Sequence, residues 1–557
     1  MYFNYGEQIK TGYKHDDCQF YMPGFWYRRN LRSPKEAPSF HTSDSWLVRE
    51  DRLSTPLTAA FNSANGKSMS VIRIDKFDKE ALATHKEGEV IVSGETSIGY
   101  TGFENVGGMT VLSYGFPYRE APKTYIRKLT LAPSVEAFQL LRKGDSITLT
   151  WELAEIDAAD FSECVQRTWE YCYDTNRPQP VDTPYTVDRM KEVLSNFFVE
   201  SYVDNTPTHY YSGVELKTAT CDHVDVAEIG FVGRTLLNAF NALEYGALQN
   251  RQELMNSANS VFDTYLQNGF SPAGFFNEVV HYNRGFKESK HSIRRQSEGV
   301  YAVLNYLTYE KQQKRKHPEW EKRIKGILDS FLRLQNEDGS FPRKFKDDFS
   351  IVDGTGGSTP SATLPLVMAY KYFKDKRYLE SAKRTVGYLE KELISKADFF
   401  SSTLDANCED KEASLYAATA TYYLALATKG AERTHYAELS KKAAYFALSW
   451  YYTWDVPFAE GQMLGDIGLK TRGWGNVSVE NNHIDVFVFE FADVLNYEGH
   501  MCGVAKVGFY PEVVQHTNWD YGRNGKGYYN NIFAPGWTVA SLWELFSPGR
   551  AEKFLLK

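Results

Sequence analysis

The first third of the chain alternates apolar and polar residues with the period of β-strands. Branched and aromatic residues recur at every second position in short runs, and Gly and Asn turns separate the runs. The clearest runs are SMSVIRI, GEVIVSG, MTVLSYGF, TYIRKLTLA and DSITLTWELAEI. Because such strands bury one face and expose the other, residues 1 to about 172 are predicted to form a β-sandwich.

A proline-rich segment separates this part from the rest of the chain. TNRPQPVDTPY, from Thr175 to Tyr185, holds three prolines in seven residues, and such composition is typical of an extended linker. We therefore expect a β-sandwich domain over residues 1–178 and a second domain over 186–557. About 170 residues is small for a two-sheet sandwich that precedes a large helical domain. The sequence therefore leaves open that the sandwich domain is truncated at its N-terminus.

From Val187 onward the apolar residues recur with the period of an α-helix. Helices are predicted near 187–204, 226–248, 251–268, 293–313, 317–335, 360–375, 377–394, 410–429, 431–453, 479–497, 499–516 and 535–546. Every second helix carries fewer charges, and a helix without a charged face must be buried. Six hairpins of this kind close into an (α/α)6 toroid, with an open solenoid as the competing architecture. Pro365 implies a kink or a later start in the sixth helix.

The segment from Ser402 to Gly430 shows the inner type of helix most clearly. It reads STLDANCEDKEASLYAATATYYLALATKG, and after the acidic cluster it has no charge until its end. The next helix, ERTHYAELSKKAAYFALSW, has one charged and one apolar face, as an outer helix does. The charged residues at 409–412 are too costly to bury unpaired. The N-terminus of the inner helix is therefore predicted to open on a wet cavity.

The segments that lead into the predicted inner helices are unusually polar. In a toroid, these lead-in segments and the helix N-termini meet at one mouth. They read CDHVDVAEIG, SIRRQSEGV, DGTGGSTPS, CEDKEA, TRGWGNVSVENNHID and FAPGWT. Helix capping accounts for their Ser and Asp residues, but not for Arg295, Gln296, Trp474 or His483. We therefore expect a ligand site at this mouth.

Carboxylates of different lead-in segments are expected to face one another across the mouth. In a ring of six hairpins the fourth inner helix lies opposite the first, and the fifth lies opposite the second. The predicted facing sets are Asp410 and Glu412 against Asp225 and Glu228, and His483 and Asp485 against Glu298. Glycoside hydrolysis requires this arrangement, because one carboxylic acid protonates the leaving oxygen while a carboxylate activates water.

The sequence also suggests roles for the carboxylates. Glu298 lies in the first turns of its helix beside Arg295, where the helix dipole lowers a pKa, so it is expected to be a base or a substrate anchor. Asp410 and Glu412 lie in the most acidic lead-in segment, and one of them is expected to be the acid with a raised pKa. Their spacing of three places Glu409 and Glu412 on one helix face, with Asp410 elsewhere.

Other polar residues complete the predicted site. His483 and Asp485 form an alternative proton-handling pair, and Trp474 is expected to be the floor of a sugar subsite. The predicted substrate-binding residues are Arg295, Gln296, Trp474, Asn481, Asn482, Asp225 and Glu228. There is no HExxH motif, Cys/His cluster or EF-hand loop, so neither a metal nor another cofactor is predicted.

Composition and charge bear on the partners and the location of the protein. The net charge of −8 and the scattered basic residues disfavour a nucleic acid partner. No apolar run approaches the roughly 18 residues of a membrane span, so none is predicted. The start, MYFNYGEQIK, lacks the regions of a signal peptide. A periplasmic or secreted protein whose signal has been removed is expected, and a cytoplasmic location is the alternative.

These features together resemble a known superfamily. The alternating helices, the turn QNEDGSFP, and the segments GGSTPSATLPLVMAY and CEDKEASLYAATATYYLALA are similar to those of the six-hairpin glycosidases, which are carbohydrate-active enzymes. The preceding β-sandwich is similar to the layout of bacterial glucoamylases and disaccharide phosphorylases. The resemblance implies a saccharide pocket at the inner-helix mouth, carboxylate catalysis and a bacterial, glycan-degrading setting.

Three functions follow from this reading. The first is a glycoside hydrolase that removes a terminal sugar from a complex polysaccharide, with Arg295 and Lys411 available to hold a uronate. The second is a polysaccharide lyase that uses Asn481, Asn482 and His483 with Arg295. The third is a glycan-binding protein without catalysis. An oligosaccharide or polysaccharide is the expected partner in each case, and the oligomeric state is left open.

Overall fold

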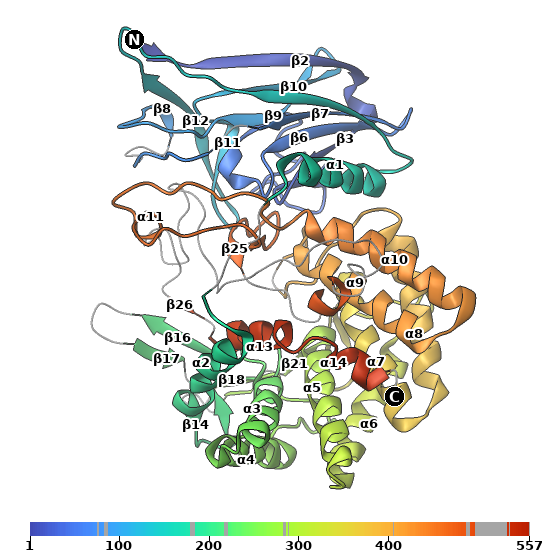
Figure 1. The fold of residues 1–557 in the computed structure, drawn as a ribbon. Coiled ribbons are helices and arrows are strands. Elements are labelled where there is room, and N and C mark those ends of the chain that lie inside the picture. Colours follow the sequence, from blue (N-terminus) through green and yellow to red (C-terminus); the bar gives the residue numbers. More distant parts are fainter. Residues whose placement is uncertain are drawn as a thin grey trace.

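The computed structural model describes residues 1–557 except 75–76, 83–86, 179–183, 217–220, 225, 282–285, 288, 405, 486–490, 496–531, 534 and 556–557. Figure 1 shows a strand-rich N-terminal part above a helical part, with the segment around α11 (Met463–Asp466) and β25 (Ile484–Asp485) between them. This arrangement confirms the predicted order of a β-sandwich followed by a helical toroid.

The strand-rich part consists of two sheets. The larger sheet has the order β1 (Tyr2–Phe3), β12 (Thr130–Leu140), β11 (Arg119–Arg127), β5 (Trp46–Arg49), β9 (Tyr100–Val106), β10 (Met109–Phe116) and β2 (Tyr5–Lys14), with β8 (Gly88–Ile91) parallel to β12. The smaller sheet has the order β13 (Trp151–Asp157), β7 (Lys67–Arg73), β6 (Leu57–Asn62), β3 (Cys18–Met22) and β4 (Trp26–Arg28). Apart from the pairing of β8 with β12, the neighbouring strands of both sheets are antiparallel.

Aromatic residues from both sheets fill the sandwich core. Phe20 of β3 stacks on Phe103 of β9 with 3.7 Å between ring centroids. Trp26 of β4 packs on Trp46 of β5 and on the edge of Phe103, and Leu112 of β10 is fully buried in the same cluster. The alternation of apolar residues in the sequence thus places one face of each sheet in a shared core.

The strands end earlier than the sequence predicted. After β13 the chain forms α1 (Phe161–Asn176), which is capped by Asp160 and packs against α10 (Gly430–Leu448) of the helical part. The prediction of β structure to about residue 172 is wrong here. The buried residues Cys164, Val165 and Trp169 have helical spacing, and this signal distinguishes α1 from the preceding strands.

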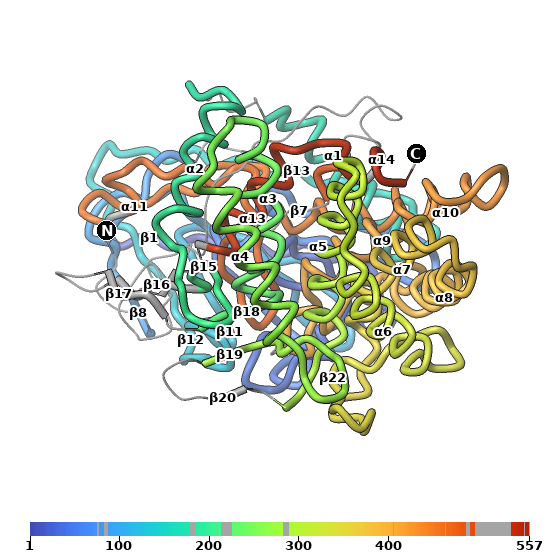
Figure 2. The backbone as a smooth tube through the Cα atoms, turned by 90° about the horizontal axis from the view of Figure 1, so that it is seen from below, coloured from blue at the N-terminus to red at the C-terminus, as the bar shows by residue number. Residues whose placement is uncertain are grey.

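The helices of the second part form hairpins of one inner and one outer member (Figure 2). The described hairpins are α3 (Thr235–Gln249) with α4 (Gln252–Asn268), α5 (Ile293–Gln312) with α6 (Pro318–Leu334), α7 (Pro360–Phe373) with α8 (Lys376–Tyr388), and α9 (Lys411–Ala427) with α10. The inner helices α3, α5, α7 and α9 contact one another in that order, and α13 (Pro535–Leu545) packs against α3 and against α2 (Val187–Glu200).

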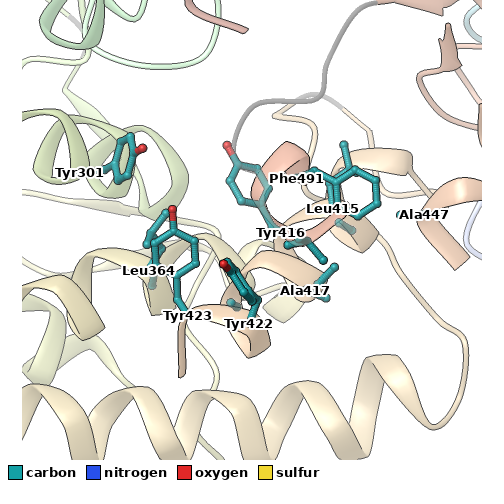
Figure 3. Close-up of a cluster of buried hydrophobic side chains, with 14 of the residues drawn as sticks. Tyr301, Leu364, Leu415, Tyr416, Ala417, Tyr422, Tyr423, Ala447 and Phe491 are labelled. Atoms are coloured by element: carbon teal, nitrogen blue, oxygen red, sulfur yellow. The ribbon is translucent and has the colours of Figure 1, made fainter. Parts of the chain in front are cut away.

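Burial separates the inner from the outer helices as predicted. Every residue of α9 from Lys411 to Leu426 is buried, whereas much of α10 is exposed. Figure 3 shows Tyr416, Tyr422 and Tyr423 of α9 in the cluster at the centre of the helical part. The inner helices therefore form the core against which the outer helices pack.

Short strands and helices fill the segments between these helices. They are β14 (Tyr202–Val203), β15 (His209–Tyr210), β16 (Gly213–Leu216), β17 (Cys221–Val224), β18 (Val226–Glu228), β19 (Val279–His281), β20 (Phe286–Lys287), β21 (Lys290–Ser292), β22 (Lys344–Lys346), β23 (Ile351–Asp353), β24 (Gly475–Asn476), β26 (Ile532–Phe533) and α14 (Arg550–Leu555).

Two predicted helices start in the wrong place. The helix predicted from 226 begins only at Thr235, because β18 occupies residues 226–228 and pairs with β19. The helix predicted from 479 does not start there, because β25 occupies residues 484–485 and pairs with β24; of the described residues in this range, 491–495 are helical. The helix predicted over 499–516 lies outside the described residues. In contrast, α7 begins at Pro360, the start of the predicted range, and continues through Pro365, so the later start considered for this helix is wrong.

Candidate functional site

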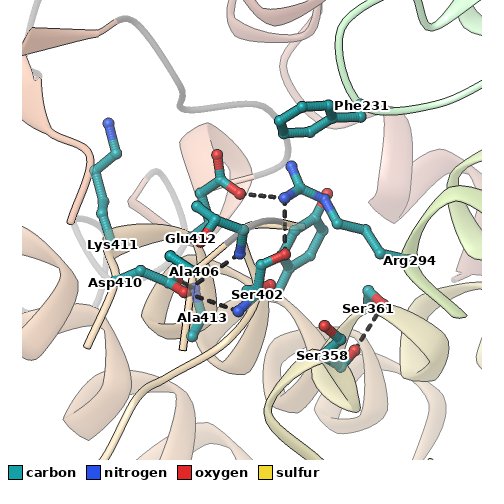
Figure 4. A network of polar contacts seen from close by, with 12 residues as sticks. Phe231, Arg294, Ser358, Ser361, Ser402, Ala406, Asp410, Lys411, Glu412 and Ala413 are labelled. Carbon is teal, nitrogen blue, oxygen red and sulfur yellow. Dashed lines mark hydrogen bonds and ion pairs between the residues drawn. The ribbon is translucent and has the colours of Figure 1, made fainter. Parts of the chain in front are cut away.

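Arg294 of α5 is the central residue at the mouth of the inner helices. Its Nε donates to Glu298 Oε1 at 3.0 Å, and its Nη1 donates to the Ser402 carbonyl oxygen at 2.9 Å and to Glu412 Oε2. Figure 4 shows the guanidinium of Arg294 between Glu412 and Ser402, below the ring of Phe231. Arg294 is fully buried, so its charge is balanced by these protein groups rather than by solvent.

Glu298 accepts hydrogen bonds on both carboxylate oxygens. Arg234 Nη2 donates to Oε1 at 2.8 Å and the Tyr416 hydroxyl donates to the same oxygen at 2.5 Å, in addition to Arg294. The backbone N–H of Phe231 donates to Oε2 at 2.5 Å. Burial alone raises the pKa of Glu298, but the two arginines outweigh it and hold the pKa at about 2. Glu298 is therefore ionised at neutral pH.

The loop that donates to Glu298 requires a glycine. A Cβ atom at Gly230 would lie 2.4 Å from Glu298 Oε2 and 3.0 Å from the Arg295 Cα atom. Both Phe231 and Arg234 have left-handed backbone conformations, with φ of 56° and 43°, which residues with side chains seldom adopt. These two strained residues are the ones that hold Glu298 from the side of α3.

Asp410 caps the N-terminus of α9. Its backbone is extended, with φ −140° and ψ 150°, and its Oδ1 accepts from the Ala413 N–H at 2.6 Å. Its Oδ2 accepts from the backbone N–H of Ser402 at 2.7 Å and of Thr403 at 3.3 Å. Burial raises the pKa of Asp410, although these backbone donors oppose the rise. Asp410 therefore fastens the 402–403 segment to the helix, as a capping residue does.

Glu412 has different surroundings from Glu298. It is nearly fully buried and bonds to Arg294, which it shares with Glu298. Burial raises the pKa of Glu412 to about 7 against the attraction of Arg294, and the nearby Asp410 and Asp485 add to the rise. Glu412 thus exchanges a proton near neutral pH, whereas Glu298 does not.

A second ion pair lies on the other side of the α9 N-terminus. Lys411 Nζ bonds to Asp485 Oδ1, and both side chains are buried. Lys411 also lies over the ring of Tyr451, 5.4 Å from its centroid. The backbone of Lys411 donates to the Val477 carbonyl oxygen at 3.0 Å. The segment 475–485 is therefore fastened to the start of α9 by backbone bonds as well as by the ion pair.

The structure brings several of the predicted site residues together, but in pairs that differ from the predicted facing sets. Glu298 and Glu412 meet through Arg294, so the carboxylates of α5 and α9 are joined. Asp485 lies beside Lys411 of α9, and Glu228 lies 3.4 Å from Arg295. The predicted sharing of a helix face by Glu409 and Glu412 is wrong, because α9 begins at Lys411 and helical spacing does not apply to Glu409. Asp225 lies outside the described residues.

Three of the predicted substrate-binding residues make contacts within the protein. The Gln296 amide donates to the Phe276 carbonyl oxygen at 2.9 Å and to Glu278 at 3.0 Å. The Asn482 amide donates to the Gly24 carbonyl oxygen at 2.9 Å and so joins the helical part to the sandwich.

Trp474 is buried in an apolar cluster with Tyr452, Val456, Leu464 and Ile484.

The remaining two predicted residues shape the turn before β25. The backbone N–H of Asn481 donates to Ser478 Oγ at 3.0 Å, and the His483 N–H donates to the Asn481 carbonyl oxygen at 2.9 Å.

Several residues of the site were not predicted from the sequence. They are Arg234, Arg294, Tyr416, Phe231 and Trp537, whose ring lies 5.4 Å from the Arg234 guanidinium carbon. A signal for Arg294 was present, because it precedes Glu298 by four residues and therefore shares its helix face. The same rule places Tyr416 on the face of Glu412. Arg234 and Phe231 lie in an irregular loop, and nothing in their local sequence indicates their role.

Neither a metal centre nor a membrane-spanning helix emerges from the described residues. Within them, no group of three or more His, Cys, Asp or Glu side chains is placed to hold a metal ion. No described helix has both the length and the apolar character needed to cross a bilayer.

Comparison with known proteins gives only structural matches. No family model and no curated protein matches the sequence. A cellobiose 2-epimerase from Bacillus thermoamylovorans aligns with 13% identity over 66% of this chain and 100% of its own, with a TM-score of 0.44. For a D-mannose isomerase the identity is 12%, the coverage 66% and 100%, and the TM-score 0.42.

An unsaturated glucuronyl hydrolase from Bacillus sp. GL1, which degrades glycosaminoglycan, aligns with 14% identity over 58% of this chain and 84% of its own, with a TM-score of 0.34. By their names, all three of these proteins act on carbohydrates.

Proposed function

We propose that this chain is a carbohydrate-active enzyme, and specifically a glycoside hydrolase that removes a terminal sugar from a complex polysaccharide with Glu412 as its proton donor. One observation carries the proposal. Two buried glutamates share the Arg294 guanidinium, yet the pKa of Glu298 is about 2 and that of Glu412 is about 7. Environments that separate the pKa values of neighbouring carboxyl groups are typical of acid–base catalysis.

Glu412 suits the role of general acid. A general acid is most effective when its pKa lies near the working pH, because it is then both protonated and able to release its proton. The burial that raises the pKa also keeps water away from the proton. Arg294 fixes the position of the carboxyl group, so that a glycosidic oxygen at the mouth would meet the proton in a defined geometry.

Asp485 is the proposed carboxylate that works with Glu412. It is buried beside Lys411, which supplies a balancing positive charge, and it lies near enough to Glu412 to raise its pKa. In this role Asp485 would activate water or attack the sugar. Glu298 is less suited to it, because four donors already occupy its two oxygens, which is about the number that a carboxylate accepts.

Glu298 is proposed instead as a positioning residue. It holds the side chains of Arg234, Arg294 and Tyr416 in one network, and Arg294 in turn orients Glu412. The sequence reading allowed Glu298 to be a base or an anchor, and its saturated hydrogen bonds favour the anchor. Trp537 is buried against the arginines, whereas the partly exposed ring of Phe231 beside Arg294 would offer apolar surface to the face of a sugar ring.

The test is the substitution Glu412→Gln, with Glu337→Gln as a matched control in an exposed turn. Release of reducing sugar would be measured over a panel of plant and host polysaccharides. Loss of a general acid is expected to lower turnover by roughly 10²- to 10⁴-fold, while the control retains activity. Glutamine resembles the protonated acid in shape and charge, so the variant should fold, and its unfolding midpoint in mild acid should match that of wild type.

Three results would overturn the proposal. Turnover by Glu412→Gln within about tenfold of wild type, or about 1.4 kcal/mol of barrier, would exclude Glu412 as the acid. A product that absorbs in the ultraviolet through a new double bond would show a lyase. Binding of polysaccharide by the wild type without any turnover would show a glycan-binding protein.

A further inference from the structure

A cleft of about 380 Å³ lies between the sandwich and the helical part, away from the Arg294 network. One wall comes from β3, β4 and the loops beside them, and the other comes from the segment before α9. The lining residues are Asp16, Asp17, Cys18, Gln19, Arg28, Arg29, Leu31, Arg32, Ser63, Asp398 and Glu409. A volume of this size falls within the usual range for small-molecule sites.

A partly buried ion-pair network lines the cleft. Asp398 accepts from Arg32 through both carboxylate oxygens, at 2.7 and 2.5 Å, and it also bonds to Arg28. Arg28 Nη2 donates to Glu409 Oε1 at 3.3 Å. The guanidinium of Arg32 also lies over the ring of Phe400, 3.3 Å from its centroid. These contacts hold the side chains that line the cleft in defined positions without a ligand.

Three polar atoms of the cleft residues have no hydrogen-bond partner. They are Glu409 Oε2, Arg28 Nε and Gln19 Oε1, and all three are buried. Glu409 is fully buried as a residue, and burial raises its pKa to about 7 although Arg28 lowers it. Native proteins seldom leave buried donors and acceptors unpaired, so such atoms point to a missing partner.

The backbone also holds Arg28 in an unusual conformation. Its φ of 58° lies in the left-handed region, which residues other than glycine seldom adopt. Arg28 ends β4, and this conformation accompanies a side chain that crosses from the sandwich to Asp398 and Glu409 of the helical part. Strained residues of this kind concentrate at functional sites.

The charge of the cleft indicates the chemistry of its ligand. Arg28, Arg29 and Arg32 stand against the carboxylates of Asp16, Asp17, Asp398 and Glu409, so positive and negative groups nearly balance. A phosphate or a strongly basic ligand would therefore gain little. The unpaired atoms comprise two acceptors and one donor, and a ligand must match both kinds. Sugar hydroxyl groups do so, because each one donates and accepts.

We propose that this cleft is a second saccharide-binding site, which takes a neutral mono- or disaccharide. Hydroxyl groups of the sugar donate to Glu409 Oε2 and Gln19 Oε1, and a hydroxyl oxygen accepts from Arg28 Nε. The site is separate from the proposed catalytic network, because Glu409 bonds to Arg28 of the sandwich while Glu412 bonds to Arg294. It does not depend on the hydrolase activity proposed above.

The experiment measures binding of cellobiose, maltose and lactose to the full chain by isothermal titration calorimetry. It compares wild type with Glu409→Ala, Gln19→Ala and Glu412→Gln. We expect at least one disaccharide to bind to wild type and equally to Glu412→Gln. Loss of a hydrogen bond to a charged group weakens binding about tenfold or more, so Glu409→Ala should raise the Kd by that factor. Gln19→Ala should raise the Kd by a smaller factor.

Two cleft variants are used so that the test still works if one of them does not fold. Gln19 lies on a paired strand and makes no part of the ion-pair network, so Gln19→Ala decides the matter if Glu409→Ala does not fold. The proposal is overturned if none of the three sugars binds to wild type. It is equally overturned if Glu412→Gln abolishes binding and the folded cleft variants keep it, because the sugar would then occupy the inner-helix mouth alone.

Discussion

Replacing Glu298 by glutamine should destabilise the protein strongly. The pKa of Glu298 falls from 4.5 to about 2 on folding, and each pKa unit corresponds to roughly 1.4 kcal/mol. The ionised carboxylate therefore contributes about 3 kcal/mol to the free energy of unfolding at neutral pH. Breaking a buried ion pair by removing one partner costs about 3–5 kcal/mol in other proteins, so two separate arguments give the same size.

The pH dependence of this effect has a definite sign. Because folding lowers the pKa of Glu298, its stabilisation is present above pH 4.5 and is lost as the pH falls through about 2. The difference in stability between wild type and Glu298→Gln should therefore be full at pH 7 and shrink in acid. Urea unfolding of wild type, Glu298→Gln and the control Glu337→Gln, followed by circular dichroism, would measure it.

Two results would refute the reasoning about Glu298. A loss of less than about 1 kcal/mol at pH 7 would mean that the two arginines do not depend on this carboxylate, since breaking a buried pair costs several times more. A difference that grows as the pH falls would mean that Glu298 is not held ionised. A catalytic base without an anchoring role would lower turnover and leave the unfolding midpoint unchanged, so the same variants also separate the two roles.

Other predictions concern both stability and activity. Folding raises the pKa of Glu412 to about 7, so its contribution to stability is full below pH 4.5 and is lost as the pH rises through 7. Glu412→Gln should therefore unfold at higher urea than wild type at pH 8, and wild-type turnover should decline above about pH 7. Lys411→Met removes the buried cation beside Asp485 and should lower the free energy of unfolding by roughly 3–5 kcal/mol, measured in the same way. A Cβ atom at Gly357 would lie 2.0 Å from a backbone carbonyl oxygen, whereas one at Gly326 meets open space. Thermal unfolding should show Gly357→Ala destabilised and Gly326→Ala stabilised by roughly 0.5–1 kcal/mol.

The period of apolar residues was enough to predict the fold class and most of the helices. In α9 the run of small and aromatic residues from Ala413 to Ala427 has no charged face, and the structure buries nearly all of it. In α10 the charged residues mark one exposed face. Such patterns are informative because a helix without a charged face must be buried and one with a charged face is half exposed, whichever segments pack against it.

The segment 475–485 shows where this reasoning fails. Its apolar residues Val477, Val479 and Ile484 fit the end of a strand as well as a helix, and the choice depends on partners elsewhere. The Val479 N–H donates to the Glu409 carbonyl oxygen at 3.2 Å, and β24 also bridges to Tyr451. These pairings join residues that are far apart in the sequence, and local periodicity does not contain them.

The site itself was predictable in part. The sequence placed Glu298 and Glu412 at the same mouth, because both follow polar lead-in segments of inner helices. It did not indicate that Arg294 joins them, since the choice between two adjacent arginines depends on where α5 begins and on which face turns inward. Arg294 precedes Glu298 by one helical turn and faces the mouth, while Arg295 turns toward Glu228.

The start of α9 explains why four consecutive charged residues serve different purposes. The backbone of Asp410, the capping residue, is extended rather than helical. The side chains before and after it therefore point in different directions. Glu409 reaches Arg28 at the cleft, Lys411 reaches Asp485, and Glu412 reaches Arg294. One short segment therefore connects the proposed sugar cleft with the proposed catalytic acid. Because Glu409 and Glu412 bond to arginines of different parts of the protein, sugar binding at the cleft and catalysis at the mouth are expected to be independent, and equal binding of a disaccharide by wild type and Glu412→Gln would be the sign of it.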